Sequence, residues 1–433
     1  MSSLPTTPLE RRDQPPDPGL ASPEARGDRL MTAAEALDLI SRIAAPVTPT
    51  EEIPLARAAG RILARDVIST MDVPPHANAA VDGYAFFHDD LAEAGETTLP
   101  VTARVAAGMA LDRQARRGEA IRIFTGAPMP DGCDTVAMQE NVRTEGDSVI
   151  LDSRTRRGAN RREAGEDVAA GSIILHQGRR LGPFDIGLAA STGLTVLPCK
   201  EQLRVALFST GDEVTDPPGV LTPGAIFDAN RHAVRALLEA VGCTVTDLGI
   251  LPDDAAATRE AILDAAGGHH ALMTSGGVSV GDEDHVQRTV REHGTLHAWY
   301  MAIKPGRPLV LGDIANATFI GLPGNPAAAM VTFLRFARPL LLRLGGADDI
   351  APTTFDVRSA FSRDKKGGRR EYVRVHLRRN ADGVAEAHAF DREGAGLLSS
   401  LVDTDGLAEL PEDMTRLEAG DMIEVLPFSE VLS

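Results

Sequence analysis

The sequence predicts a multidomain α/β protein with further β-rich parts, built around a central doubly wound parallel sheet. From Leu203 onward, short apolar segments alternate with amphipathic helical segments, a pattern typical of a parallel sheet covered by helices on both faces. Two other regions, before residue 160 and after Pro352, contain short apolar segments broken by Gly, Pro and Asp, which is typical of β structure. The length of 433 residues suits about three domains.

The N-terminal half is predicted to contain three parts. Residues 1–28 are rich in proline and charge and are predicted to form a disordered tail. Residues 29–72 and 161–200 are predicted to form a discontinuous linker and dimerisation domain, opened by a helix in "LMTAAEALDLISRIA" with Thr32 as its N-cap. Residues 73–160, with segments such as "TLPVTARVAAG" and "EAIRIFTGAPMP", are predicted to form a β-rich module.

Residues 201–346 are predicted to form the α/β domain. Its expected strands are "LRVALFS", "CTVTDLGI" and "HALMTS", and its expected helices are "NRHAVRALLEAVG", "AAATREAILDAAGG" and "DHVQRTVREHG". A long helix, "PAAAMVTFLRFARPLLLRLGG", closes the domain, and Pro339 is expected to kink or end it. In residues 352–433, "EYVRVHLRR" and "VAEAHAF" are joined by the turn "NADG", and "AGDMIEVLPF" is a final strand, which predicts a small β-barrel or sandwich.

Composition excludes several classes of protein. The net charge of −18 disfavours binding to nucleic acid and to anionic membranes, and one Trp with 4% aromatic residues disfavours a stacking platform for single strands. The three cysteines, Cys133, Cys199 and Cys243, are far apart, which excludes a zinc finger and fits a reducing compartment. With no apolar segment of membrane-spanning length and no signal peptide, we expect a cytoplasmic protein.

Acidic residues follow three successive expected strands. These are Asp212 with Glu213, Asp253 with Asp254, and Asp282 to Asp284. A single acid at such a position is commonly a helix N-cap, and capping remains an alternative for each. Because ligands bind beyond the carboxyl ends of the strands in an open parallel sheet, three acidic strand ends together indicate a binding site.

The segment "SGGVSVGDEDH" (Ser275–His285) combines an anion-binding pattern with acids. Backbone N–H groups of the glycine turn and of the following helix can hold a phosphate. The acids would repel that phosphate unless a hard cation lay between them, and Mg²⁺ is the cation that binds carboxylates together with substrate phosphates. We therefore predict a metal–phosphate site. The sequence has no GxxxxGK[ST] motif, so this is not the phosphate loop of a P-loop NTPase.

Two further segments could bind an oxyanion. "AIKPGRP" supplies Lys304 and Arg307 beside Pro305, although both cations could equally be solvated. "GLPGNPAA" follows a strand and starts a helix, so that its loop amides are a second candidate.

Taken together, the motifs resemble one family. "VDGYAF", "FTGAPMP", "REAGEDV", "STGDEV", "SGGVSVGDED", "AIKPGRP", "GLPGNPAA", "RREYVRV" and "GLLSSL" occur in the order found in the molybdopterin molybdenumtransferases, called MoeA in bacteria and the E domain in gephyrin. They span nearly the whole chain from Leu30 to Phe428.

The resemblance implies an elongated homodimer of four-domain subunits, in which the sheet domain of one subunit faces the β-rich module of the other. It implies that adenylylated molybdopterin and molybdate are substrates, that Mg²⁺ promotes cleavage of the phosphoanhydride, and that AMP leaves. It also implies a molybdopterin adenylyltransferase and downstream molybdoenzymes or nucleotide transferases as partners.

The resemblance also assigns residues. The implied catalytic residues are Asp82, Thr125, Glu213, Asp253, Asp284 and Lys304, of which Glu213, Asp253 and Asp284 would bind the metal. The implied substrate-binding residues are Ser275, Gly276, Gly277, Ser279, Gly281, Pro305, Arg307, Pro323, Pro326, Arg374 and Ser399. On the residues alone, Asp82 and Thr125 could simply be turn formers.

The chain departs from the family pattern at Tyr300, where a basic residue is usual, and at Ala395, where serine is frequent. Two basic segments, 154–162 and 363–370, could be solvated loops or could attract the pterin phosphate. The adjacent His269 and His270 are interpreted as structural, because no further metal ligand lies at a suitable spacing.

Two other functions remain to be separated from this one. A molybdopterin adenylyltransferase would resemble the sheet domain alone, and the flanking modules argue against it. A clustering scaffold would require partner-binding repeats or a long linker, which the sequence does not contain.

Overall fold

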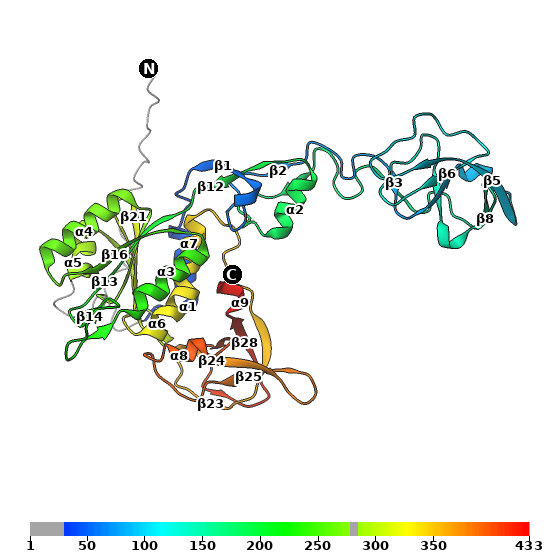
Figure 1. Ribbon diagram of the computed structural model, residues 1–433. Helices are drawn as coiled ribbons and strands as arrows, with labels where there is room; N and C mark the ends of the chain where they lie inside the picture. The colour runs from blue at the N-terminus through cyan, green and yellow to red at the C-terminus, as the bar shows by residue number, and fades with distance from the viewer. Residues whose placement is uncertain (1–29, 278–284, 433) are drawn as a thin grey trace, which may run out of the picture. The chain divides into compact units, whose positions relative to one another are not determined.

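The computed structural model of the chain describes residues 30–277 and 285–432, so the predicted tail lies outside the described residues (Figure 1). The chain forms two compact units. The large unit comprises the described residues up to 51, together with 60–62 and 200–432, and the small unit comprises 52–59 and 63–199. The finer division of the small unit into a linker domain and a β-rich module stays a prediction.

A six-stranded sheet forms the centre of the large unit, in the order β16-β13-β17-β21-β20-β18. The strands are β13 (Arg204–Thr210), β16 (Thr244–Leu251), β17 (Ala271–Ser275), β18 (Gly294–Tyr300), β20 (Pro308–Ile314) and β21 (Ala317–Leu322). The predicted parallel sheet is present as the four neighbours β16, β13, β17 and β21. The structure adds β20 and β18 as antiparallel strands at one edge, so the sheet is mixed.

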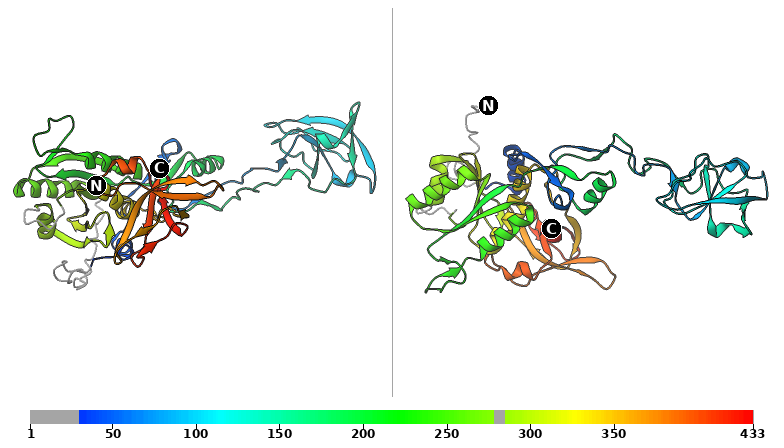
Figure 2. Two further views of the ribbon diagram at one scale, coloured as in Figure 1. Left: turned by 90° about the horizontal axis from the view of Figure 1, so that it is seen from below. Right: turned by 45° about the horizontal axis from the view of Figure 1, so that its top comes forward.

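Helices cover both faces of this sheet, as Figures 1 and 2 show. On one face, α1 (Ala33–Ile43) and α3 (Ala229–Val241) pack in the same hydrophobic cluster as Val205 and Leu207 of β13. On the other face, α4 (Ala255–Gly268) and α5 (His285–His293) share a cluster with the intervening residues Ala206 and Phe208. Because successive side chains of a strand point to opposite faces, a strand covered on both sides is apolar throughout.

The predicted N-cap of α1 is confirmed. The Thr32 side chain accepts a hydrogen bond from the Glu35 N–H (3.2 Å), and the Glu35 carboxylate accepts one from the Thr32 N–H (2.9 Å). This reciprocal capping box satisfies two N–H groups that otherwise lack a partner in the first helical turn.

The long closing helix continues through Pro339 instead of ending there. It consists of α6 (Pro326–Thr332), a π-helical turn (Phe333–Ala337) and α7 (Arg338–Leu344). Proline has no N–H, and its ring clashes with the carbonyl four residues earlier in an α-helix. The π turn, which is wider than an α turn, ends at Ala337, two residues before Pro339, and the helix continues past the proline to Leu344.

The C-terminal part of the large unit is a closed five-stranded β-barrel. Its strands are β22 (Phe355–Ser359), β24 (Arg370–Arg379), β25 (Ala385–Ala389), β26 (Gly406–Leu410) and β28 (Met422–Pro427). They follow the order β24-β25-β22-β28-β26, and pairing of β24 with β26 closes the barrel. The short strand β19 (Ile303–Lys304) pairs in parallel with β24, which brings the segment after β18 to the barrel. The remaining short elements of the large unit are β14 (Val214–Thr215), β15 (Ile226–Phe227), β23 (Arg363–Asp364), β27 (Arg416–Leu417), α8 (Ser399–Val402) and α9 (Ser429–Leu432).

The small unit is mainly β structure. Its largest sheet follows the order β7-β4-β6-β5-β9-β8, with β4 (Gly83–Phe86), β5 (Glu96–Val105), β6 (Ala120–Ile123), β7 (Thr135–Met138), β8 (Arg143–Glu145) and β9 (Ser148–Asp152). Its smaller strands and its α-helix are β2 (Val67–Ile68), β3 (Asn78–Ala79), β10 (Arg161–Arg162), β11 (Ile173–Leu175) and α2 (Pro183–Ser191). The chain passes between the two units at the strands β1 (Thr50–Pro54) and β12 (Val196–Lys200).

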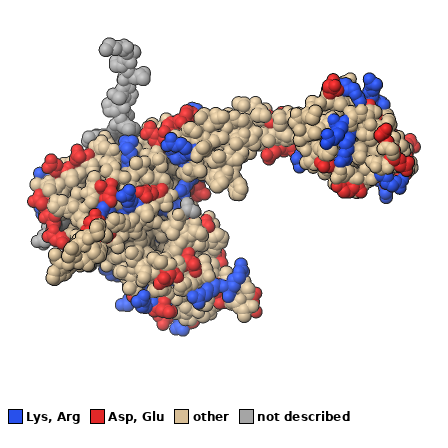
Figure 3. All heavy atoms as spheres, in the orientation of Figure 1, with Lys and Arg blue, Asp and Glu red and all other residues tan. Residues whose placement is uncertain are grey.

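Both units present acidic and basic side chains interspersed on the face seen in Figure 3. Within the described part of the chain, no helix combines the length and the apolar character that a membrane span requires.

Candidate active site

Three loops leave the parallel strands at the same edge of the central sheet. Glu213 follows β13, Asp253 follows β16, and Gly276 and Gly277 follow β17. The three strands pair in parallel, so their carboxyl ends share one edge. The predicted site residues Ser279, Gly281 and Asp284 lie outside the described residues, as do Asp282 and Glu283.

The two acids after β16 have different roles. Asp254 is the N-cap of α4, because its carboxylate accepts hydrogen bonds from the N–H groups of Ala256 (3.1 Å) and Ala257 (2.8 Å). The side chain of Asp253 is less than half exposed and lies 3.6 Å from Nε2 of His285, the first residue of α5. Capping therefore explains Asp254, whereas Asp253 lies beside the first residue of α5.

The glycine turn after β17 packs closely against the neighbouring strand ends. Gly276 and Gly277 both have positive φ, and a side chain on Gly277 would lie 2.4 Å from the Thr210 hydroxyl. The Gly276 N–H donates to the Leu322 carbonyl (3.2 Å), so this N–H is used within the protein and not directed at a ligand. The assignment of Gly276 as a substrate-binding residue stays a prediction, and its own N–H is already used by the Leu322 carbonyl.

Ser275 is also directed at the protein. Its hydroxyl donates to the Pro323 carbonyl (3.1 Å) and accepts a hydrogen bond from the Asn230 side-chain amide (2.8 Å). The same amide donates to the Gly324 carbonyl (2.7 Å), so Asn230 joins the loop after β17 to the loop after β21. No sequence motif indicated Asn230, the second residue of α3, which is far from both loops in the sequence.

The loop "GLPGNPAA" leads from β21 into α6, as predicted, with Pro326 as the first helical residue. The N–H of Ala327 donates to the Ala395 carbonyl (2.9 Å), so a protein carbonyl occupies this amide at the start of α6. This loop therefore joins α6 to the segment that carries Ala395.

The predicted cations gather at a pocket of about 240 Å³ that is lined by the segment around β19 and by the C-terminal barrel. Its lining residues include six cationic and two acidic side chains, namely Lys304, Arg307, Arg363, Arg369, Arg374, Arg392, Glu371 and Glu393, as well as Pro305 and Ala395. The pocket is therefore strongly positive, although the whole chain carries a net charge of −18.

Arg374 is the most buried of these cations, with 8% of its surface exposed. Its Nη1 donates to the Gly394 carbonyl (2.9 Å), and its Nε is buried with no hydrogen-bond partner among the described residues. Burial lowers the pKa of Arg374 from its usual value, and the neighbouring Arg363 lowers it further, although Glu393 acts in the opposite direction. A buried guanidinium with an unused donor is well suited to bind an anion.

Lys304 and Arg363 are shared between the two acids of the pocket. Nζ of Lys304 lies 3.6 Å from Glu371 and 3.5 Å from Glu393. The guanidinium of Arg363 lies 3.0 Å from Glu371 and 2.9 Å from Glu393. Burial alone would raise the pKa of Glu393, but Arg363 and Lys304 hold it below its usual value.

Two of the residues singled out in the sequence lie away from this pocket. Tyr300 packs against the hydrophobic cluster beneath α4 and α5 and does not line the pocket. The absence of a basic residue at position 300 therefore removes no cation from the pocket lining. Ser399 is exposed at the start of α8 and does not line the pocket either.

In the small unit, the structure brings Asp82 and Thr125 together. One Asp82 carboxylate oxygen accepts hydrogen bonds from the Thr125 N–H and from the Thr125 hydroxyl, both at 2.8 Å. These bonds, with the charge of Arg122, lower the pKa of Asp82. Arg122 stacks on Tyr84 and Phe124, with its guanidinium 4.9 and 4.8 Å from the ring centres. Asp82 is thus more than a turn former, because its side chain fixes the hydroxyl of Thr125.

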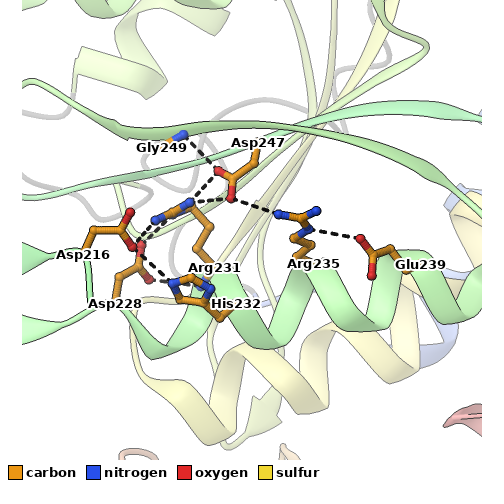
Figure 4. A network of polar contacts seen from close by, with 8 residues as sticks. All are labelled: Asp216, Asp228, Arg231, His232, Arg235, Glu239, Asp247 and Gly249. Carbon is orange, nitrogen blue, oxygen red and sulfur yellow. Dashed lines mark hydrogen bonds and ion pairs between the residues drawn. The ribbon is translucent and has the colours of Figure 1, made fainter. Parts of the chain in front are cut away.

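A buried arginine holds the segment that follows Glu213, as Figure 4 shows. The Arg231 side chain is 3% exposed and forms ion pairs with Asp216, Asp228 and Asp247. Burial alone would lower the pKa of Arg231, but the three carboxylates raise it. The network joins the segment after β14 to α3 and β16, and no sequence motif marks it, because Asp216 and Asp247 lie 15 and 16 residues from Arg231.

The two basic segments differ in what they contact. Arg154, Arg157 and Arg161 each pair with a carboxylate in the small unit. In the other segment, Arg363 and Arg369 line the cationic pocket. The hypothesis of anion attraction is thus supported for the second segment.

Comparison with known proteins gives matches along nearly the whole chain. Residues 31–193 match the MoeA N-terminal region (domain I and II), residues 206–343 match a probable molybdopterin binding domain, and residues 356–428 match the MoeA C-terminal region (domain IV).

Full-length relatives and a solved structure agree with these matches. The molybdopterin molybdenumtransferase of Haemophilus influenzae is 37% identical over 387 residues, which cover 89% of this chain and 95% of that protein. The protein of the same name from Nostoc sp. is 36% identical, over 87% of this chain and 88% of its own. A crystal structure of the molybdopterin biosynthesis moeA protein from Pyrococcus horikoshii OT3 has a TM-score of 0.80 and 28% identity, covering 92% of this chain and 100% of its own.

Proposed function

We propose that this chain, a member of the MoeA family of molybdopterin molybdenumtransferases, acts on adenylylated molybdopterin, with Mg²⁺ and with release of AMP. The activity of the family is the insertion of molybdate into molybdopterin during molybdenum cofactor biosynthesis. The observation that carries this proposal is the cationic pocket, whose residue Ala395 accepts a hydrogen bond from Ala327 at the start of α6, the helix that follows β21.

The proposed role of the pocket is to bind molybdate, a tetrahedral dianion. Lys304 contributes an ammonium group and Arg374 a buried guanidinium, and Arg307 and Arg363 add positive charge. Hydrogen bonds between such cations and an oxyanion are stronger than neutral ones and fix its orientation. The dithiolene sulfurs belong to the pterin, so the protein needs to supply only position and charge.

The residues at the strand ends suit the proposed Mg²⁺. Among residues 30–277 and 285–432, no three His, Cys, Asp or Glu side chains are arranged to hold a metal ion. Mg²⁺ requires only one or two protein carboxylates when substrate phosphates and water complete its coordination, and Glu213 and Asp253 provide carboxylates of this kind. In the proposed site they bind the metal together with Asp284. The ion would neutralise charge that develops on the phosphoanhydride.

We also propose a homodimer in which Asp82 and Thr125 of one subunit complete the site of the other. The hydrogen bonds between the partly buried Asp82 and the exposed Thr125 support a role beyond local structure.

The test is AMP release from adenylylated molybdopterin by the full-length protein. We expect release only when molybdate and Mg²⁺ are both present, with loss of activity in Asp253→Asn. A molybdopterin adenylyltransferase would instead form the adenylylated pterin from ATP. AMP release that is independent of molybdate would contradict the proposed function.

A further inference from the structure

We propose that Glu393 is an exchangeable anion built into the cationic pocket, which the incoming oxyanion must displace, so that Glu393 limits the affinity of this pocket for molybdate. This inference rests on the proposed function of the pocket as an oxyanion site.

The position of Glu393 resembles that of a bound anion. Its Oε1 lies 2.9 Å from Nη1 of Arg363, and its Oε2 lies 3.5 Å from Nζ of Lys304. Each carboxylate oxygen therefore contacts a different cation of the pocket. Two oxygens of a tetrahedral dianion would use the same two cations, so Glu393 and the substrate compete for them.

The second acid of the pocket, Glu371, contacts the same cations but is fixed. Its side chain is 9% exposed and accepts a hydrogen bond from Nε of Arg363 (3.0 Å). The Glu393 side chain is 63% exposed. An exposed ion pair is weak and its carboxylate is easily rehydrated, whereas a buried carboxylate cannot leave its partners at low cost. Glu371 is thus the permanent partner of Lys304 and Arg363, and Glu393 is the replaceable one.

The backbone next to Glu393 is anchored, so its side chain can leave without the loop. Gly394 has φ of +146°, a conformation open essentially to glycine alone, and its carbonyl accepts the hydrogen bond from Arg374. The next residue, Ala395, accepts the hydrogen bond from Ala327 at the start of α6. Rotation of the Glu393 side chain into solvent breaks neither bond.

The test is to remove the charge of Glu393 while keeping its size. We expect Glu393→Gln to lower the dissociation constant for molybdate about fivefold, equivalent to about 1 kcal/mol, because exposed ion pairs contribute roughly this much. The matched control is Asp391→Asn, which makes the same change in net charge two residues away on an exposed residue outside the pocket. Its effect should be about twofold or less, because solvent and salt screen it.

The measurement is calorimetric titration of molybdate into the full-length wild-type protein and both variants at physiological ionic strength, with thermal melting to show that all three are folded. Tighter binding in Glu393→Gln alone supports the inference. Equal affinities in all three proteins, equal gains in both variants, or weaker binding in Glu393→Gln would overturn it. Failure of the proposed function is distinguishable, since the wild-type protein would then bind no molybdate at all.

Discussion

Replacement of Arg374 tests the proposed oxyanion site at its most buried cation. Arg374 lies on β24, is 8% exposed, and has an Nε with no hydrogen-bond partner among the described residues. A hydrogen bond to a charged group contributes about 1.5 to 3 kcal/mol. Loss of one such bond in Arg374→Gln should therefore raise the molybdate concentration for half-maximal AMP release about 10- to 150-fold.

Two further variants separate charge from geometry. Arg374→Lys keeps the positive charge but loses the planar fork of donors, so its effect should lie between those of wild type and Arg374→Gln. Arg378→Gln removes an exposed arginine from the same strand outside the pocket and should change the half-maximal concentration by about twofold at most. Equal half-maximal concentrations for Arg374→Gln and Arg378→Gln would show that Arg374 does not bind the oxyanion.

Three other predictions concern stability and assembly. Glu119 is 6% exposed and paired with Arg113, and that arginine is the chief reason why the pKa of Glu119 is lowered to about 2. The ionised carboxylate therefore stabilises the fold at pH values above its unfolded pKa of about 4.5, and this stabilisation is lost as the pH falls toward 2. In denaturant titrations, Glu119→Gln should destabilise the protein by about 1 to 2 kcal/mol at pH 7 and by less at pH 3. The Glu409 side chain is 1% exposed and forms ion pairs with two arginines. In the same assay, Glu409→Gln should lower the free energy of unfolding by about 3 kcal/mol, because it leaves two buried charges without their partner. An unchanged denaturant midpoint of unfolding would show that the ion pairs contribute nothing to stability. Mixed dimers of Asp82→Ala and Asp284→Asn chains should regain AMP release because one of their two shared sites is intact, and activity no higher than that of either parent would exclude a shared site.

The alternation of strands and helices in the large unit was predictable because each element has a strong local pattern. The apolar segments of β13 and β17 are buried on both faces of the sheet, and α3 ends at Gly242 with the positive φ typical of a helix C-cap. The antiparallel pair β20–β21 lacked such a signal. Its turn is formed by Ala315 and Asn316, and Ala315 adopts a positive φ that alanine rarely takes, so no Asn-Gly or Asp-Gly motif marks the hairpin.

The pocket was only partly predictable, for a different reason. Lys304 and Arg307 stand in one short motif, and Arg374 was assigned from the family resemblance. Arg363 and Glu393 join them only because β19 pairs with β24 of the barrel, a long-range contact that no local pattern encodes. The same holds for Asn230, whose amide joins two loops that are distant in sequence.

The most decisive experiment is a crystal of the protein soaked with molybdate, because the anomalous signal of molybdenum locates the bound ion independently of activity. We expect one strong anomalous peak inside the cationic pocket, with oxygens about 3 Å from Nζ of Lys304 and from the guanidinium of Arg374. A molybdenum peak at another site, with none in this pocket, would show that the pocket is not the molybdate site.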